Sequence, residues 1–285
     1  MSARPGGLRP RAVPAQAVPA QAVPAQAVSA QAVSAQAVSP QTVPAAFDAG
    51  AFAYDRLVGA NPGYHEHLRL SARRMRLPGE GRGLRLLDAG CGTGASTAAL
   101  LAAAPHAEIV AVDASGAMLD RARAKPWPPS VTFVHAPVEE LAAAGVRGPF
   151  DAVLAAYLIR NVADRDAVLR DLRGLLRPGG TLAVHEYSVA DSRLARAVWE
   201  AVCAVVIIPA GRLLSGDAAL YRYLRGSVTA FDGAARFRRR LGDAGFTGVH
   251  SETVPGWQRG IVHTFLASRP AGDGLAGGGP AGGRR

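Results

Sequence analysis

The segment Leu84-Arg85-Leu86-Leu87-Asp88-Ala89-Gly90-Cys91-Gly92-Thr93-Gly94 joins a short apolar run to a turn that contains three alternate glycines. An alanine-rich stretch with helical composition, 95–104, follows directly. Glycine lacks a Cβ atom, so the backbone of such a turn can approach a ligand closely, and the next helix presents free N–H groups to that ligand. The segment therefore predicts a strand, a ligand-binding turn and a helix.

Apolar runs and helical segments continue to alternate on both sides of this unit. Further strands are expected at 108–113, 131–135, 150–157, 181–187, 248–253 and 261–268. Helices are expected at 116–124, 164–176 and 233–244, with Pro178-Gly179-Gly180 ending the second of them, and 191–225 reads as inserted helices. Apolar strands separated by helices indicate a mostly parallel sheet that is buried on both faces. The sequence thus predicts an α/β fold with a doubly wound, Rossmann-like sheet of seven strands and inserted helices over the active site.

The two ends of the chain have a different composition. Residues 1–44 repeat a five-residue unit, first seen as Ala12-Val13-Pro14-Ala15-Gln16, and residues 270–285 are rich in glycine. Small side chains and recurrent proline cannot bury enough surface to offset the entropy of ordering. Both ends are predicted to be disordered tails around one folded domain at 45–269.

Charge and cysteine content narrow the class of protein. The net charge is +10, and the compact basic run Arg238-Arg239-Arg240 is interpreted as a solvated helix face, so no nucleic-acid partner is predicted. Two cysteines cannot form a disulfide framework, which favours a cytoplasmic protein. The longest apolar run, Ala201–Ile208, is too short to span a membrane and is expected to end at Pro209.

The glycine turn by itself satisfies the dinucleotide pattern, so a nicotinamide-dependent oxidoreductase stays open as an alternative. Asp88 favours S-adenosylmethionine, because a carboxylate is repelled by a pyrophosphate and attracted by an amino group or a sulfonium. Asp113, at the end of the second strand, can accept both ribose hydroxyls. The predicted cofactor-binding residues are Asp88, Gly90, Gly92, Thr93, Gly94, Asp113, His135, Ala136 and Tyr157. No metal site is predicted.

A family resemblance rests on three segments of the sequence. They are Tyr157-Leu158-Ile159-Arg160-Asn161-Val162, Leu176-Arg177-Pro178-Gly179-Gly180 and Glu186-Tyr187-Ser188. They resemble the G-L-R-N-V and K-P-G-G…E-F-S motifs of the ubiquinone/menaquinone biosynthesis C-methyltransferases. Tyr221-Arg222-Tyr223-Leu224 with Ser227 is similar to a third motif of that family. The chain departs from the family pattern at Leu158, which replaces a glycine, and at His185, which replaces an apolar residue.

The resemblance implies a class I methyltransferase that methylates a ring carbon of a prenylated quinol. It places Arg160 and Asn161 beside the acceptor with Tyr54 closing over it, and it makes His65, His185 and Glu186 candidates for substrate binding. Methylation of oxygen or nitrogen in a secondary metabolite stays open. The apolar segment 197–208 fits either a tunnel for an isoprenoid tail or a lid helix, and peripheral membrane contact and a homodimer also stay open.

Overall fold

The computed structural model describes residues 42, 45, 48, 63–215 and 218–272. The predictions for the tails at 1–44 and 270–285, apart from Thr42 and 270–272, and for Tyr54 lie outside these residues. The description that follows concerns the compact unit that begins at Gln36.

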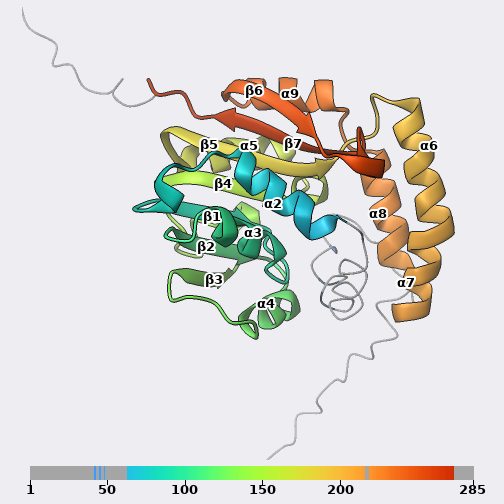
Figure 1. Cartoon of the computed structure of the whole chain (residues 1–285), viewed down its shortest axis with the longest axis horizontal. Coiled ribbons are helices and arrows are strands. Elements are labelled where there is room, and N and C mark those ends of the chain that lie inside the picture. Colours follow the sequence, from blue (N-terminus) through green and yellow to red (C-terminus); the bar gives the residue numbers. More distant parts are fainter. Residues whose placement is uncertain (1–41, 43–44, 46–47, 49–62, 216–217, 273–285) are drawn as a thin grey trace, which may run out of the picture. The chain divides into compact units, whose positions relative to one another are not determined.

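Seven strands form one sheet in the order β3-β2-β1-β4-β5-β7-β6 (Figure 1). Strands β1 to β5 pair in parallel, whereas β7 is antiparallel to both of its neighbours. The seven strands are β1 Arg85–Ala89, β2 Glu108–Asp113, β3 Val131–His135, β4 Phe150–Ala156, β5 Leu176–Tyr187, β6 Thr247–Thr253 and β7 Val262–Ser268. The predicted doubly wound, mostly parallel sheet is confirmed.

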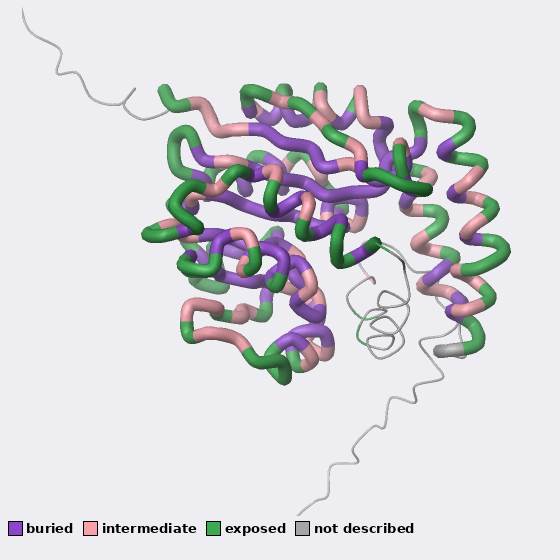
Figure 2. The backbone as a smooth tube through the Cα atoms, viewed as in Figure 1, coloured by how far each residue is buried: buried purple, intermediate pink, exposed green. Residues whose placement is uncertain are grey.

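Helices cover both faces of this sheet. Helices α2 (Tyr64–Arg74) and α3 (Ala95–Ala103) share one hydrophobic core with one face of the strands, and α5 (Arg165–Leu175) and α9 (Ala234–Asp243) share another with the opposite face. Helix α4 (Gly116–Arg123) packs beside β2 and β3. Neighbouring strand residues alternate between the two cores, as Leu86 and Leu87 do, because successive side chains of a strand point to opposite faces. The five inner strands are accordingly buried along most of their length, whereas the residues of the edge strands β3 and β6 are exposed or half-buried (Figure 2).

The inserted region between β5 and β6 is helical, as predicted. It consists of α6 (Arg193–Val202), a π turn η5 (Cys203–Ile207), α7 (Ile208–Ser215) and α8 (Ala219–Thr229). These helices stand together beyond the carboxyl ends of β4 and β5 (Figure 1). Four short 3-10 segments complete the described elements: η2 Pro78–Gly81, η3 Val138–Glu140, η4 Ile159–Asn161 and η6 Gly256–Gln258.

Two local predictions were wrong. Strand β5 begins at Leu176, before the glycine pair, because Gly179 N–H donates to the Arg269 carbonyl and Arg269 N–H donates to the Gly180 carbonyl, both at 2.9 Å. Pro209 does not end the apolar segment. It lies in the first turn of α7, directly after the π turn, where the missing N–H of proline is tolerated. By length and composition alone, Arg193–Leu213 is the one described helix that could cross a membrane.

Candidate active site

One cavity opens at the carboxyl ends of β1, β2 and β4. The strand order reverses between β1 and β4, and open α/β sheets bind ligands at such a switch point. Its walls come from Tyr64, Ala89, Gly90, Cys91, Gly92, Thr93, Ala95, Ser96, Val112, Asp113, Ala114, Ser115, Met118, Ala136, Pro137, Val138, Glu139, Ala156, Tyr157, Leu158, Arg160, Asn161 and Val162. The cavity therefore joins the glycine turn to the segment that follows β4.

The glycine turn has a backbone that side chains would strain. Gly90, Gly92 and Gly94 have φ values of 75°, 54° and 90°, in the left-handed region that favours glycine. The N–H groups of Gly90 and Cys91 both donate to the Val112 carbonyl, at 2.8 and 2.9 Å, which ties the turn to β2. A Cβ atom on Gly92 would meet no other atom within 4 Å, so the backbone there is open to close approach by a ligand.

Asp113 holds the opposite wall at the end of β2. Its carboxylate accepts from Gly92 N–H at 2.7 Å and from Ser115 N–H at 2.9 Å. Burial raises the pKa of Asp113, and the two backbone donors oppose that shift. A carboxylate has about four acceptor positions, so it can still receive the two hydroxyls of a ribose. The glycine turn and Asp113 therefore fit the nucleoside part of S-adenosylmethionine.

Asp88 lies beneath the turn and does not line the cavity. Its Oδ2 accepts from the hydroxyls of Ser96 at 2.8 Å and Thr97 at 2.6 Å, and it is fully buried. Burial raises the pKa of Asp88 to about 7. Its Oδ1 has no hydrogen-bond partner in the part of the chain that the structure describes. Asp88 anchors the start of α3 against the turn, and its predicted contact with the cofactor stays a prediction.

Arg160 and Glu186 form a buried ion pair at the other end of the cavity. Arg160 Nη1 donates to Glu186 Oε1 at 2.6 Å, and the two side chains are 5% and 0% exposed. Glu186 also accepts from Tyr187 N–H at 3.0 Å. Burial raises the pKa of Glu186, and the guanidinium of Arg160 opposes that shift. Arg160 lines the cavity and Glu186 does not, so Glu186 acts on the cavity through Arg160.

Tyr157 connects this ion pair to the rest of the cavity wall. It has φ of 56°, a conformation that costs a residue with a side chain about 1–3 kcal/mol. Its carbonyl accepts from Arg160 Nη1 and from Asn161 Nδ2, both at 2.9 Å. The Asn161 oxygen accepts from the Tyr223 hydroxyl at 3.3 Å. The strained backbone of Tyr157 thereby orients both Arg160 and Asn161.

The hydroxyl of Tyr157 ends a buried chain of hydrogen bonds beneath α2. Its neighbour is His185 Nε2 at 3.0 Å, and His185 Nδ1 lies 2.7 Å from the Ser71 hydroxyl. The Ser71 hydroxyl lies 2.7 Å from that of Thr264, which accepts from Arg74 Nη1 at 2.9 Å. Burial lowers the pKa of His185 to about 3, so the ring is neutral at physiological pH.

Arg74 can only donate, so the Thr264 hydroxyl accepts its hydrogen bond. The neutral ring of His185 carries one proton, so one ring nitrogen donates and the other accepts, and the Ser71 and Tyr157 hydroxyls can take the matching roles in either tautomer. His185 is thus a hydrogen-bonded residue in the sheet that holds Tyr157, and it does not line the cavity.

The structure brings most of the predicted site residues together. The cavity includes Gly90, Gly92, Thr93, Asp113, Ala136, Tyr157, Arg160 and Asn161. It does not include His135, which lies 3.0 Å through Nε2 from the Ala114 carbonyl, or His65, which is exposed on α2. Gly94 is the residue from which α3 begins and also lies outside the lining.

Several residues were missed by the sequence reasoning. Tyr64 lines the cavity and stacks on Tyr157, with the ring centroids 5.6 Å apart. The Tyr221–Leu224 motif pointed to Tyr223 without giving its contact with Asn161. Ser71 and Thr264 carry no sequence signal, because their contacts are long-range: Ser71 lies 114 positions from His185 and 193 positions from Thr264 along the chain.

Comparison with known proteins gives a consistent result. A model of the ubiE/COQ5 methyltransferase family matches residues 35–268. The ubiquinone/menaquinone biosynthesis C-methyltransferase UbiE of Syntrophotalea carbinolica is 36% identical over 210 residues, which cover 73% of this chain and 85% of the relative. The demethylmenaquinone methyltransferase of Clavibacter sepedonicus is 32% identical over 232 residues, covering 81% and 91%.

A solved structure shares the fold at lower identity. The magnesium protoporphyrin IX methyltransferase of Synechocystis PCC 6803, with bound S-adenosylhomocysteine, superposes with a TM-score of 0.56 at 18% identity. The superposition covers 81% of this chain and 99% of that one. At this identity the likeness concerns the fold, which is that of an S-adenosylmethionine-dependent methyltransferase.

Proposed function

Because the chain belongs to the ubiE/COQ5 methyltransferase family, we propose that it transfers a methyl group from S-adenosylmethionine to a ring carbon of a prenylated quinol. The observation that carries this proposal is the position of Arg160. Its buried guanidinium lies on the wall of the same cavity as the glycine turn and Asp113.

The glycine turn and Asp113 bind the cofactor at one end of the cavity, and Arg160 acts on the acceptor at the other. When bound, S-adenosylmethionine supplies an electrophilic methyl group on its sulfonium. The glycine turn admits the cofactor closely and Asp113 accepts its ribose hydroxyls, so the nucleoside is held at the ends of β1 and β2. The side chains of Tyr64, Leu158 and Val162 add apolar surface to the wall of the same cavity.

Arg160 makes the acceptor carbon more reactive. An arginine stays protonated at physiological pH, so it stabilises a phenolate and does not act as a base. A phenolate pushes electron density onto the ring carbon that would receive the methyl group. The C–S bond of the donor would break as the new C–C bond forms, which leaves S-adenosylhomocysteine, and the methylated carbon would then release its proton to solvent and restore the aromatic ring. Asn161, fixed between the Tyr157 carbonyl and the Tyr223 hydroxyl, orients the ring hydroxyl beside it. Positioning of this kind supplies much of the rate of an in-line displacement.

We also place the reaction in the cytoplasm. Cys91 and Cys203 are both buried and unpaired with each other, which agrees with a reducing compartment. Membership of the methyltransferase family and the fold support the same location.

The test is a methylation assay with labelled S-adenosylmethionine and a reduced demethylmenaquinone analogue, followed by mass spectrometry of the product. We expect a methyl group on a ring carbon, and loss of turnover in Arg160→Lys, because lysine keeps the charge without the planar guanidinium. Arg170→Lys makes the same change at an exposed position of α5 and serves as the matched control.

The other outcomes discriminate between the alternatives. A methyl group on oxygen or nitrogen would overturn C-methylation and leave methyl transfer intact. Thermal protection by NAD(H) with none by S-adenosylhomocysteine would overturn the cofactor as well, since a ligand that binds the folded state raises the melting temperature.

A further inference from the structure

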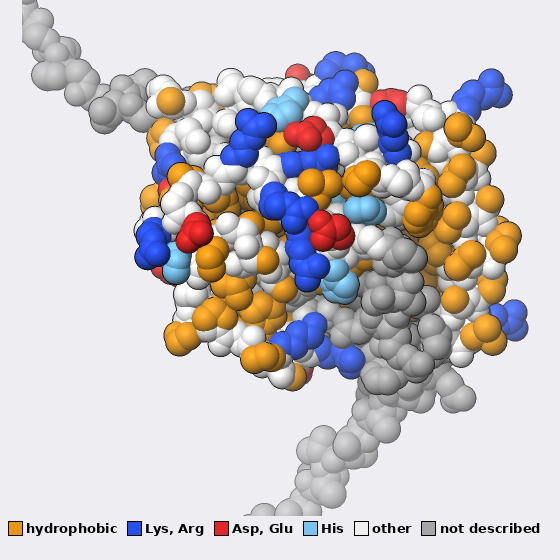
Figure 3. Space-filling model, in the orientation of Figure 1, with side chains coloured by type: hydrophobic (Ala, Val, Ile, Leu, Met, Phe, Trp, Pro, Cys, Tyr) orange, Lys and Arg blue, Asp and Glu red, His pale blue; other side chains and the backbone are white. Residues whose placement is uncertain are grey.

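The helix formed by α6, η5 and α7 presents an apolar side to solvent. Five large hydrophobic side chains are exposed among the described residues, and four of them lie on this helix. They are Leu194 at 75%, Val205 at 74%, Val206 at 56% and Leu213 at 86% exposed. Figure 3 shows hydrophobic side chains gathered along the margin of the molecule where α6 and α7 lie. An exposed patch of this kind marks an interaction site.

The π turn keeps this side continuous along the whole helix. The residues that pack inward, Ala195, Trp199, Cys203 and Gly211, are spaced by multiples of four. In a regular α-helix, which has 3.6 residues per turn, residues spaced by four move gradually around the helix axis. The π turn η5 has more residues per turn, so it offsets this rotation and keeps the inward residues on one side. Leu194, Ala197, Ala201, Val205 and Leu213 consequently share one side, which we call the outer face; all five are exposed.

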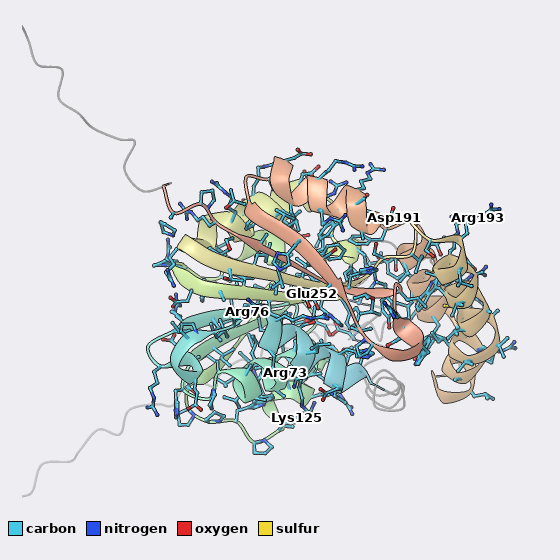
Figure 4. The ribbon with its side chains drawn as sticks, turned by 45° about the horizontal axis from the view of Figure 1, so that its top comes forward. Arg73, Arg76, Lys125, Asp191, Arg193 and Glu252 are labelled. Atoms are coloured by element: carbon cyan, nitrogen blue, oxygen red, sulfur yellow. The ribbon has the colours of Figure 1, made fainter. Side chains whose placement is uncertain are left out.

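Charged side chains are confined to the two ends of the outer face. Arg193 and Arg196 lie in the first turn of α6 and Arg212 lies beside Leu213 at the far end, and all three are exposed. Figure 4 shows Arg193 at the outer end of α6, pointing away from the sheet. Between Arg196 and Arg212 the one acidic residue is Glu200, which is paired with Arg225 of α8. The pattern is an apolar surface with cationic ends.

The inner side of the same helix is tied to α8. Trp199 is buried and its indole N–H lies 3.5 Å from the Arg225 carbonyl. A Cβ atom on Gly211 would come within 2.1 Å of the Tyr221 ring, so α7 and α8 are in close contact there. A helix held in this way can lie on a bilayer but cannot cross it without breaking these contacts.

We propose that the outer face docks the protein on an anionic phospholipid bilayer, with the helix lying parallel to the surface. The apolar side chains enter the boundary between headgroups and acyl chains, and the arginines at the ends meet lipid phosphates. A second copy of the chain fits less well. If two outer faces paired in antiparallel, Arg193 and Arg196 of one copy would face Arg212 of the other. If they paired in parallel, each arginine would face the same arginine of the other copy. Both arrangements place positive charges against each other.

The test is co-flotation of the full chain with phosphatidylcholine vesicles, with and without phosphatidylglycerol, in the absence of any quinone. We expect binding that requires phosphatidylglycerol and weakens with salt. Val205→Glu/Leu213→Glu should weaken it about tenfold or more, because two acidic side chains would have to enter the lipid boundary. Ala102→Glu/Ala143→Glu adds the same charge at exposed positions away from the helix and should change binding only slightly.

Equal losses in the two double variants would overturn the proposal, because the effect would then be one of net charge. So would a vesicle-independent dimer that Val205→Glu/Leu213→Glu converts to a monomer, as seen by light scattering. Since the vesicles contain no methyl acceptor, either result leaves the proposed reaction untouched, and failure of the methylation assay leaves this proposal untouched. Unchanged S-adenosylhomocysteine binding by each variant verifies that it is folded.

Discussion

The ion pair between Arg160 and Glu186 gives the sharpest prediction about stability, through the substitution Glu186→Leu. The carboxylate receives Arg160 Nη1 at 2.6 Å, Tyr187 N–H at 3.0 Å and Arg160 N–H at 3.4 Å. Leucine removes all three acceptor contacts and leaves a buried guanidinium that cannot release its proton. Breaking a buried pair from one side costs about 3–5 kcal/mol, and we expect Glu186→Leu to lower the free energy of unfolding by that amount.

The opposite substitution, Arg160→Leu, should cost less and should depend on pH. Glu186 can take up a proton once its partner is lost, and burial already raises its pKa above the ordinary value of 4.5. Between these two pKa values, Glu186 of the folded variant holds a proton that the unfolded chain has released. The free energy of unfolding therefore falls as pH rises from the pKa of Glu186 in the unfolded chain through its pKa in the folded variant. The variant should therefore be closer to wild type at pH about 5 than at pH about 8.

The double variant Arg160→Leu/Glu186→Leu completes the cycle. With both charges gone, two apolar side chains fill the site, and such replacements are neutral or stabilising by about 1–4 kcal/mol. Urea unfolding followed by circular dichroism measures all four proteins. A loss below about 1 kcal/mol in Glu186→Leu, or a double variant as unstable as the sum of the single ones, would refute the reasoning. The double variant should be folded and inactive, which separates the stability of the pair from its part in the reaction.

Three further predictions concern Asp113, Asp88 and His185. Asp113→Asn should weaken S-adenosylhomocysteine binding in calorimetry about tenfold or more, because hydrogen bonds to a charged group are worth about 1.5–3 kcal/mol; unchanged affinity would remove Asp113 from the cofactor site. The folded pKa of Asp88, about 7, lies above its ordinary value of 3.8, so the cofactor-free protein should lose stability as pH rises between these values. In Asp88→Asn the urea midpoint should depend less on pH over this range, and a pH dependence equal to that of the wild type would contradict the prediction. His185→Leu should remove the hydrogen bonds of the ring to the Tyr157 and Ser71 hydroxyls, cost about 1–3 kcal/mol in unfolding experiments and lower kcat, with S-adenosylhomocysteine affinity retained. Wild-type kcat in that variant would show that Arg160 is positioned without the network.

The cofactor half of the site was predictable because its signals are local. The run from Leu84 to Gly94 contains a strand, a turn and a helix start within a few residues, and the structure places them as β1, the cavity wall and α3. The strand that carries Asp113 could be recognised from its own apolar residues. Local composition and backbone requirements determine all of these features, so one sequence is sufficient to predict them.

The acceptor half was predictable only in part, since it depends on pairing between distant segments. Glu186 was a candidate for substrate binding, and the fold pairs it with Arg160. The start of β5 at Leu176 depends on hydrogen bonds to Arg269, far along the chain. The hydrogen-bond chain from His185 continues to Ser71 of α2 and from there to Thr264 of β7, and both look like ordinary core positions in the sequence. No periodicity or motif in the sequence predicts these contacts between distant segments.

Leu158 and His185, at which the chain departs from the family pattern, act at this half in different ways. Leu158, in place of a glycine, lines the cavity and would be 3.0 Å from a Cβ atom on Gly90, so it narrows the space between the cofactor turn and the acceptor directly. His185, in place of an apolar residue, lies outside the cavity lining and contacts the lining residue Tyr157 through its ring and its carbonyl. A change at Leu158 should therefore alter which acceptors fit, whereas a change at His185 should alter how well Arg160 and Asn161 are held for any acceptor. The cofactor turn contains neither departure, which is why the reaction class can be conserved while the acceptor side differs.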